Sequence, residues 1–292
     1  MKKKIMYACG IAAACLLLST GMSLARTRVQ ALPWYEKYPM VCHALGQTKE
    51  GDIMTNSKDA FLYNYSLGGR VFEADIRFTS DGVMVLRHDW DSDLGQAADF
   101  GWTEEEQWAV TAREFLEAPI GDKYKPMLLE DWFAIMDRYP DIYFVTDTKY
   151  SATVKEDFRI FVDTAVKNGY EDVLSRVIVQ IYYKEMYDEV MSVYDFEHVI
   201  WTLYYIDYPG GQEVLDFMTE KSIPVLTVQS SLWNDNVKMQ RELRDSDIKI
   251  FVHTVNDEGE GRRRINQGVD GIYSDRIVSG AVRQWLRSRQ AD

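Results

Sequence analysis

The sequence predicts an α/β protein, a single-domain (β/α)8 or TIM barrel that follows an N-terminal signal peptide. From about residue 39 onward, short apolar runs rich in β-branched and aromatic residues alternate with stretches of helical periodicity. There are about eight such runs, which favours a closed parallel barrel over an open doubly wound sheet. Without a leader of 25 residues the chain of 292 has about 267, the usual length of one barrel.

Residues 1–25 have the layout of a secretory signal peptide. Three lysines begin it, an almost wholly apolar run extends to Leu18, and small residues lead to Ala25. An uncleaved anchor is the alternative, because the apolar run is only slightly shorter than a bilayer span. A lipoprotein linked through Cys15 is less favoured, because the apolar run continues beyond it. We therefore expect an exported protein (secreted, periplasmic or on the cell surface) whose barrel is 26–292.

The net charge and the cysteine content exclude several kinds of binding partner and an intrachain disulfide. The formal net charge of −13 includes three leader lysines, so the mature chain carries about −16. Such an acidic surface repels nucleic acids and anionic bilayers, and leaves a small phosphate ester as the possible anionic ligand. We expect no nucleic-acid partner and no stable protein partner. Cys42 is the only cysteine after the leader, so the mature chain has no intrachain disulfide.

The predicted elements follow in order along the chain. The strands are 40–44, 70–77, 142–148, 176–181, 198–203, 223–228, 249–254 and 270–273, with a further short strand at 84–87. The helices are 57–67, 128–139, 151–168, 184–193, 212–221 and 259–267. An irregular segment at 89–125 is longer than an ordinary connection, which is typical of lids and binding loops. Its tryptophans, Trp90, Trp102 and Trp108, are expected to pack a small cluster or to line a substrate mouth.

Charged side chains gather where the predicted strands end, which is where barrel active sites lie. They are His43, Glu73, Asp75, His88, Asp147 and Lys149. Glu73 and Asp75 are two residues apart on one strand and therefore point to the same face. Buried carboxylates on one face repel each other unless a cation lies between them. Such oxygen ligands suit Ca²⁺ or Mg²⁺, so we expect one divalent cation at this position.

The order of these motifs resembles the glycerophosphodiester phosphodiesterase family. The likeness starts at His43 and at Asn56, and includes Glu73-x-Asp75 and His88-Asp89. It also covers 79–82, 111–115, 126–132, 147–149, 254–256 and 268–275, and so spans most of the mature chain.

The resemblance implies a metal-dependent hydrolase that converts glycerophosphodiesters into glycerol phosphate and an alcohol. It implies that His43 and His88 are the general acid and base, since imidazole titrates near working pH. Glu73, Asp75 and Asp147 are the implied metal ligands, with Asp147 where the family usually has glutamate. Lys149 and Asn56 are the implied substrate contacts.

Further candidate residues for a substrate pocket lie near the ends of the later predicted strands. Gln180, Tyr182, Trp201 and Tyr204 lie near such ends, and we expect Gln180 and Trp201 to bind substrate. His253 is either a pocket residue or a structural one, and we include it in the predicted substrate site. His198 begins a strand, which favours a structural role.

Two departures from the family bear on the substrate. Ala44 stands where the family has an arginine that holds the phosphate, and Met54-Thr55 replaces the usual Pro-Glu before Asn56. The missing arginine and the Asp-x-Lys at 147–149 also resemble the sphingomyelinase D group, which forms a cyclic phosphate from phospholipids. Three functions therefore stay open: a hydrolase, a cyclising phospholipase acting on substrates such as lysophospholipids, and a non-catalytic barrel that binds a phosphorylated ligand.

Overall fold

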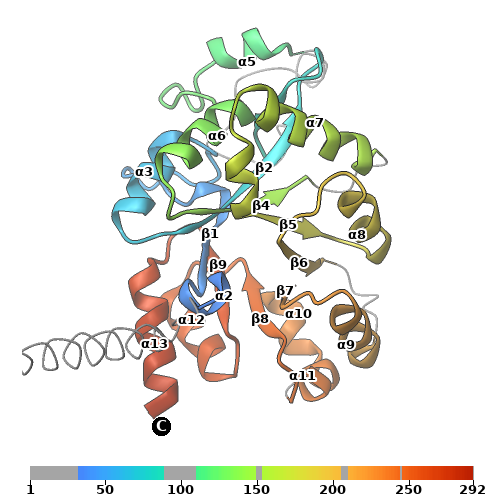
Figure 1. The fold of residues 1–292 in the computed structure, drawn as a ribbon. Helices are drawn as coiled ribbons and strands as arrows, with labels where there is room; N and C mark the ends of the chain where they lie inside the picture. Colours follow the sequence, from blue (N-terminus) through green and yellow to red (C-terminus); the bar gives the residue numbers. More distant parts are fainter. Residues whose placement is uncertain (1–31, 89–109, 149–152, 205–209, 244, 292) are drawn as a thin grey trace, which may run out of the picture. The chain divides into compact units, whose positions relative to one another are not determined.

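The computed structural model describes residues 32–88, 110–148, 153–204, 210–243 and 245–291. Trp34–Asp292 form one compact unit in which eight parallel strands close into a barrel surrounded by helices (Figure 1). The closing contacts are those of β1, which pairs with β2 on one side and with β9 on the other. The predicted TIM barrel is therefore confirmed. The predicted signal peptide lies outside the described residues and stays a prediction.

The barrel strands overlap the predicted runs. They are β1 (Met40–Cys42), β2 (Val71–Phe78), β4 (Tyr143–Asp147), β5 (Val177–Ile181), β6 (His198–Leu203), β7 (Val225–Gln229), β8 (Lys249–His253) and β9 (Gly271–Ser274). The ninth strand, β3 (Met84–Leu86), pairs antiparallel with β2 and corresponds to the predicted short strand at 84–87.

Six of the helices match predicted ones. They are α3 (Lys58–Ser66), α6 (Leu129–Arg138), α7 (Val154–Lys167), α8 (Lys184–Met191), α9 (Gly211–Glu220) and α12 (Glu258–Asn266). Local chemistry explains several starts: Ser57 accepts a hydrogen bond from the Ala60 amide at the beginning of α3, and Asp257 does the same for Glu260 in α12.

Other helical segments were not predicted. They are α2 (Trp34–Lys37), α5 (Ala112–Glu117), α10 (Ser230–Asp235), α11 (Val237–Leu243), α13 (Ser279–Ala291) and the 3-10 helices η1 (His43–Leu45) and η3 (Glu171–Arg176). The expectation that 89–125 is irregular is wrong at 112–117, where α5 lies, and is confirmed for the rest of 110–125. Thr111 and Glu114 form a reciprocal capping box that starts α5. Residues 89–109, with the three tryptophans, lie outside the described residues.

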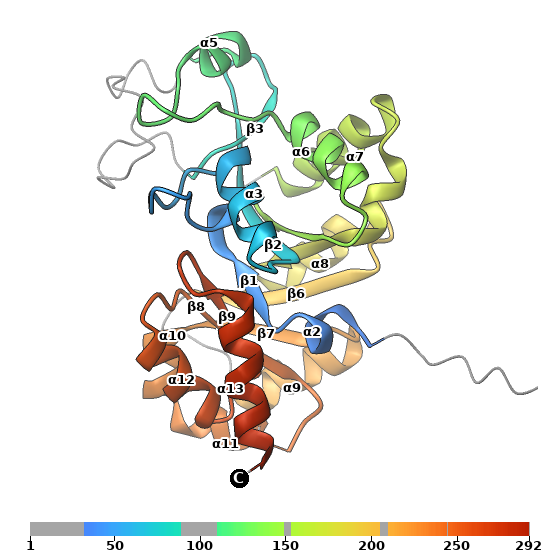
Figure 2. The same cartoon turned by 90° about the vertical axis from the view of Figure 1, so that its left-hand side faces the viewer.

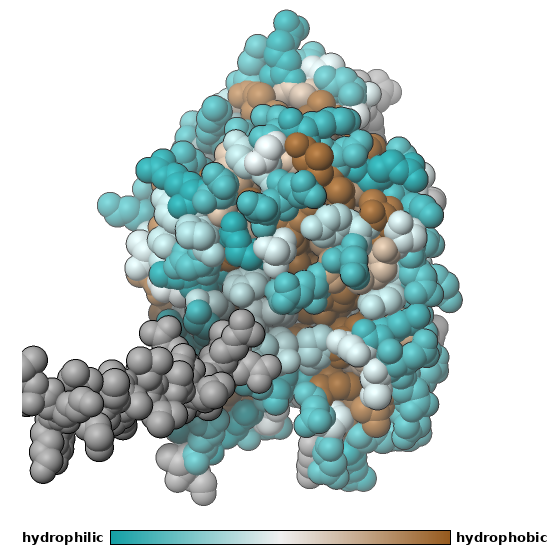
Figure 3. All heavy atoms as spheres, in the orientation of Figure 1, coloured by the Kyte–Doolittle hydropathy of each residue, from teal (hydrophilic) through white to brown (hydrophobic). Residues whose placement is uncertain are grey.

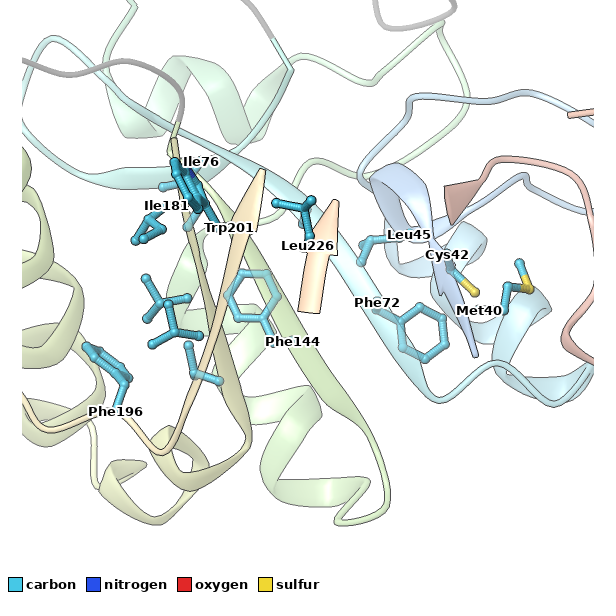
Figure 4. Close-up of a cluster of buried hydrophobic side chains, with 14 of the residues drawn as sticks. Met40, Cys42, Leu45, Phe72, Ile76, Phe144, Ile181, Phe196, Trp201 and Leu226 are labelled. Atoms are coloured by element: carbon cyan, nitrogen blue, oxygen red, sulfur yellow. The ribbon is translucent and has the colours of Figure 1, made fainter. Parts of the chain in front are cut away.

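Most buried apolar side chains of the described residues form two layers separated by the barrel wall. The larger cluster lies between the strands and the outer helices, and part of it is drawn in Figure 4. The smaller one fills the lower interior of the barrel, which is the half toward the N-terminal ends of the strands. There Val41, Val71 and Phe251 meet Trp34 of α2 and Tyr38. Figure 2, turned by 90°, shows α2 beside the barrel strands. This closed lower interior leaves the opposite end of the barrel for chemistry.

The surface of the described chain is mainly polar. Polar side chains cover most of the face in Figure 3. The large apolar side chains that are exposed lie on separate elements, such as Leu62 on α3, Val166 on α7 and Val237 on α11. No helix among the described residues has the length and apolar character needed to span a bilayer.

Candidate active site

A change from apolar to polar side chains occurs on the inner face of every barrel strand. In each strand an inward apolar or aromatic residue of the lower cluster is followed two residues later by a polar one, and alternation places both on the same face. From β1 to β9 these polar residues are His43, Glu73, Asp147, Gln180, Thr202, Thr227, His253 and Asp275. The upper interior of the barrel is therefore lined by polar groups contributed by all eight parallel strands.

Three carboxylates form the centre of this polar layer. Glu73 and Asp75 lie on β2 and Asp147 ends β4, where Asp75 and Asp147 are direct partners in the parallel ladder. One oxygen from each residue lies within 4.8 Å of the others, and all three side chains are buried. The donor set fits a hard divalent cation, because three buried carboxylates this close repel one another without a positive charge. The three predicted metal ligands are thus brought together.

Asn56 orients one of these carboxylates. Its side-chain nitrogen donates to Asp75 Oδ2 at 3.0 Å, and its side-chain oxygen accepts from the Asp75 amide at 3.2 Å. Asn56 is fully buried and adopts a φ of 46°, a conformation that asparagine tolerates better than most residues. The predicted substrate contact is therefore a partner of Asp75 in this structure.

The backbone after His43 turns sharply toward the carboxylates. Ala44 and Leu45 both have positive φ, and the turn directs the Ala44 amide to Glu73 Oε2 at 2.7 Å. Asn64 of α3 fixes the turn by donating to the carbonyl oxygens of Leu45 and Gln47. At this position the chain thus supplies a backbone N–H to a carboxylate. The strain of two non-glycine residues at positive φ is typical of functional sites.

His43 is held by a residue from the opposite end of the chain. Its Nδ1 lies 2.8 Å from Asp275 Oδ1, and its Nε2 lies 3.9 Å from Glu73 Oε2. Asn256 donates to the other Asp275 oxygen at 2.6 Å and accepts from the Asp275 amide at 2.9 Å. Asp275 thereby fixes the ring so that Nε2 faces the carboxylate cluster.

These contacts shift the protonation of both partners. Burial lowers the pKa of His43, but the negative charge of Glu73 and the hydrogen bond with Asp275 outweigh it and raise the pKa from 6.5 to about 9. Burial raises the pKa of Asp275, but the hydrogen bond and charge of His43 lower it below its ordinary value. Both shifts stabilise the ion pair in the absence of a cation.

His88 approaches the same carboxylates from another side. It follows β3, and its Nε2 lies 4.0 Å from Asp75 Oδ1. The antiparallel pairing of β3 with β2 positions it, and the Arg87 amide donates to the Asp75 carbonyl oxygen at 3.0 Å. The two predicted catalytic histidines therefore each lie near a different carboxylate of β2, at 3.9 Å for His43 and 4.0 Å for His88.

A chain of hydrogen bonds leads from the barrel wall to Asp147. The Tyr182 hydroxyl donates to Asp147 Oδ1 at 2.5 Å and accepts from Gln180 Nε2 at 2.9 Å, and Thr202 Oγ1 donates to Gln180 Oε1 at 2.9 Å. Burial and the charge of Asp147 raise the pKa of Tyr182 well above its ordinary value, so the hydroxyl keeps its proton. Gln180, predicted to bind substrate, thus supports Tyr182 and Thr202.

The other predicted pocket residues lie in different surroundings. Trp201 faces the outer helices and packs against Phe217 of α9, with ring centroids 4.9 Å apart; Figure 4 shows it in the outer apolar cluster. This placement assigns Trp201 to the core and separates it from the site. His253 lies at the inner mouth, with the Tyr204 ring 4.9 Å away. His198 packs against Tyr143 at the start of β6, remote from the strand ends.

Two residues that contact the predicted site had no specific role assigned from the sequence. Asp275 belongs to a motif of the family resemblance, but its bond to His43 joins positions 232 residues apart. Tyr182 was one of several pocket candidates, and only the structure pairs it with Asp147. Lys149, the predicted phosphate contact, lies outside the described residues.

Comparison with known proteins supports the fold and identifies the family. A phosphodiesterase from Oleispira antarctica, solved with its product sn-glycerol-3-phosphate, is 15% identical, with a TM-score of 0.65 over 88% of this chain and 99% of that one. A glycerophosphodiester phosphodiesterase from Parabacteroides distasonis is 18% identical, with a TM-score of 0.65 over 87% and 99% of the two chains. The corresponding enzyme from Thermotoga maritima is 20% identical, with a TM-score of 0.60 over 86% and 98%. A search of curated proteins finds no match to this chain.

The family assignment rests on the sequence itself. Residues 47–206, more than half of the 292, match the glycerophosphoryl diester phosphodiesterase family. The matched segment contains the three clustered carboxylates and His88, and it ends before Asp275. With the closed barrel and the acidic cluster at its mouth, the match shows that this chain belongs to the glycerophosphoryl diester phosphodiesterase family and is a phosphoric diester hydrolase.

Proposed function

We propose that the protein is a metal-dependent phosphodiesterase that hydrolyses small glycerophosphodiesters to glycerol phosphate and an alcohol. The observation that carries the proposal is the buried cluster of Glu73, Asp75 and Asp147 with two histidines, His43 and His88, each near one of its carboxylates. Sn-glycerol-3-phosphate is the product bound to the Oleispira antarctica phosphodiesterase, which supports the same product class here. We further propose that the protein is exported, on the basis of its leader.

The three carboxylates would hold one divalent cation, Ca²⁺ or Mg²⁺, whose charge would polarise a phosphoryl oxygen of the bound diester. The histidines handle protons: the neutral imidazole of the pair accepts one from the attacking hydroxyl, and the protonated imidazole donates one to the leaving oxygen. Asp275 keeps His43 in the orientation in which Nε2 faces the cluster, and Asn56 keeps Asp75 in place.

The substrate's own neighbouring hydroxyl and a water molecule are both possible nucleophiles. Ala44 brings no guanidinium to hold the phosphate, and its amide contacts Glu73 instead. A point charge restrains a phosphate less than a bidentate guanidinium does. We therefore propose that a cyclic phosphate forms first from substrates with a vicinal hydroxyl and is opened by water in a slower step.

The test is a panel of glycerophosphodiesters and lysophospholipids, assayed with and without chelator and followed by phosphorus NMR. Release of glycerol phosphate that stops on chelation and returns with Ca²⁺ or Mg²⁺ would support the proposal. We expect His43→Ala and His88→Ala each to lower kcat by about 10²–10⁴-fold. His198→Ala is the matched control, because it removes an imidazole at the opposite end of the barrel and should leave kcat near normal. Full activity in excess chelator would refute the metal role, and formation of the open monoester alone from the earliest times would refute cyclisation.

A further inference from the structure

The hydrogen bonds behind Asp147 have a fixed direction. Thr202 Oγ1 donates to Gln180 Oε1, which leaves the Gln180 amide nitrogen to donate to the Tyr182 oxygen. Because the Tyr182 oxygen accepts this bond, its own proton is available for Asp147 Oδ1, at 2.5 Å. Gln180 and Thr202 are buried, and the residues of the chain come from three adjacent strands, β4, β5 and β6, or from the residue that follows β5.

We propose that Tyr182 is a positioning residue that restricts Asp147 to ligation through one oxygen and thereby favours Mg²⁺ over Ca²⁺ at the acidic cluster. This inference rests on the proposed function, since it takes the cluster to be a divalent-cation site. It goes beyond that function by assigning the choice between the two ions to a side chain that is not itself a ligand.

The preferences of the two ions carry the argument. Ca²⁺ takes six to eight oxygen ligands and often uses both oxygens of a carboxylate, whereas Mg²⁺ requires near-octahedral geometry and is held through single oxygens. For Asp147 to bind through both oxygens, Oδ1 would have to serve the ion and the Tyr182 hydroxyl together or give up its bond with Tyr182. If that bond broke, the Tyr182 proton would have no acceptor, while the Tyr182 oxygen would still accept from Gln180, so the cost is that of one unsatisfied hydroxyl.

The short side chain of Asp147 strengthens its restriction by Tyr182. Asp147 has a short side chain, so its carboxylate has few rotatable bonds with which to turn away from the hydroxyl. Partners that orient a metal ligand in this way typically change metal affinity by about 10–100-fold when they are removed.

Tyr182→Phe is the sharpest perturbation, because it removes the hydroxyl and keeps the ring that packs 5.6 Å from Tyr204. The full chain, stripped of cations, would be titrated with MgCl₂ and with CaCl₂ in separate calorimetric experiments. We expect the variant to bind Mg²⁺ about 10–100-fold more weakly and Ca²⁺ within about threefold of the unchanged protein. Thr202→Val, which breaks the chain at its far end, should move the ratio of the two Kd values in the same direction but less.

Tyr143→Phe is the matched control. It removes a hydroxyl from the strand that carries Asp147, but at the end that packs against Trp34 and Tyr38, and it should change neither Kd. Circular dichroism and melting of the cation-free variants would report the fold separately from the ratio of Kd values.

The outcomes are distinct. A fall in the preference for Mg²⁺ in Tyr182→Phe and, more weakly, in Thr202→Val supports the inference. Equal weakening of both ions, or no change in either, overturns it and leaves the metal site standing. Failure of the unchanged protein to bind either ion overturns the metal site and this inference together. Should Tyr182→Phe fail to fold, the direction of the ratio in Thr202→Val decides.

Discussion

Replacing Asp275 by asparagine tests how His43 is controlled. The carboxylate accepts from His43 on one oxygen and from Asn256 on the other, at 2.8 and 2.6 Å. Asparagine has a single acceptor oxygen, so one of these two bonds must be lost. We expect His43 to lose its fixed orientation and a large part of its preference for the protonated state.

The size of the effect follows from the pKa of His43. The rise from 6.5 to about 9 corresponds to roughly 3 kcal/mol of interaction, caused by Glu73 and Asp275 against the opposing effect of burial. Without the Asp275 charge and hydrogen bond we expect the His43 pKa to fall below about 9 in the cation-free protein, and a fall of one pH unit would correspond to about 1.4 kcal/mol. Because the folded-state pKa is raised, protonated His43 stabilises the fold fully below pH 6.5, and this stabilisation is lost as the pH rises through about 9.

The assay is a proton NMR titration of the imidazole resonances in the presence of chelator. The chain has only four histidines, so each resonance can be assigned by single substitution. Asp275→Asn should lower the His43 pKa. In the cation-loaded protein it should also lower kcat by about 10²–10⁴-fold. Asp270→Asn is the control, since Asp270 precedes β9 at the other end and pairs with Arg289. An unchanged His43 pKa together with normal kcat in Asp275→Asn would refute the reasoning.

Three further predictions concern other parts of the site and its support. Asn56→Ala should weaken Mg²⁺ or Ca²⁺ binding by about tenfold or more in calorimetry, because Asp75 loses both hydrogen bonds from that side chain; an unchanged Kd would contradict the orienting role. Gly46→Ala should lower the free energy of unfolding in urea by more than about 1 kcal/mol, because φ is 85° and a Cβ there would meet Asn64 Nδ2 at 2.3 Å; equal stability would show that the turn adjusts. Trp201→Ala should cost about 3–5 kcal/mol in the same assay and leave KM unchanged where the variant is folded; a large rise in KM would return Trp201 to the substrate site.

The barrel was predictable because parallel strands that are buried on both faces appear in the amino-acid sequence as continuous apolar runs. The acidic cluster was predictable for a related reason: Glu73 and Asp75 share a face through simple alternation along one strand. The C-terminal helix α13 also has a signal in the sequence, since Val282, Trp285 and Leu286 have helical spacing. The short helices α10 and α11 have no such long apolar period.

Register between strands could not be obtained from the sequence. Trp201 and Gln180 both lie near strand ends, yet Trp201 pairs with Ile181 and shares its outward face, while Gln180 points inward. A shift of one residue would reverse these roles. The bond between His43 and Asp275 was hidden for a similar reason, since no local pattern links positions so far apart.

Closure of the barrel has a consequence for when the enzyme gains activity. The acidic cluster needs only β2 and β4, which are close in sequence and pair directly. His43 obtains its anchor only when β9 pairs with β1, and this joins the two ends of the barrel. A chain that ends before residue 275 can assemble the carboxylates of the cluster but has no group to orient that histidine. Under the proposed role of His43, catalysis would therefore require completion of the whole fold, and we expect a chain that ends before residue 275 to have strongly reduced activity toward phosphodiesters.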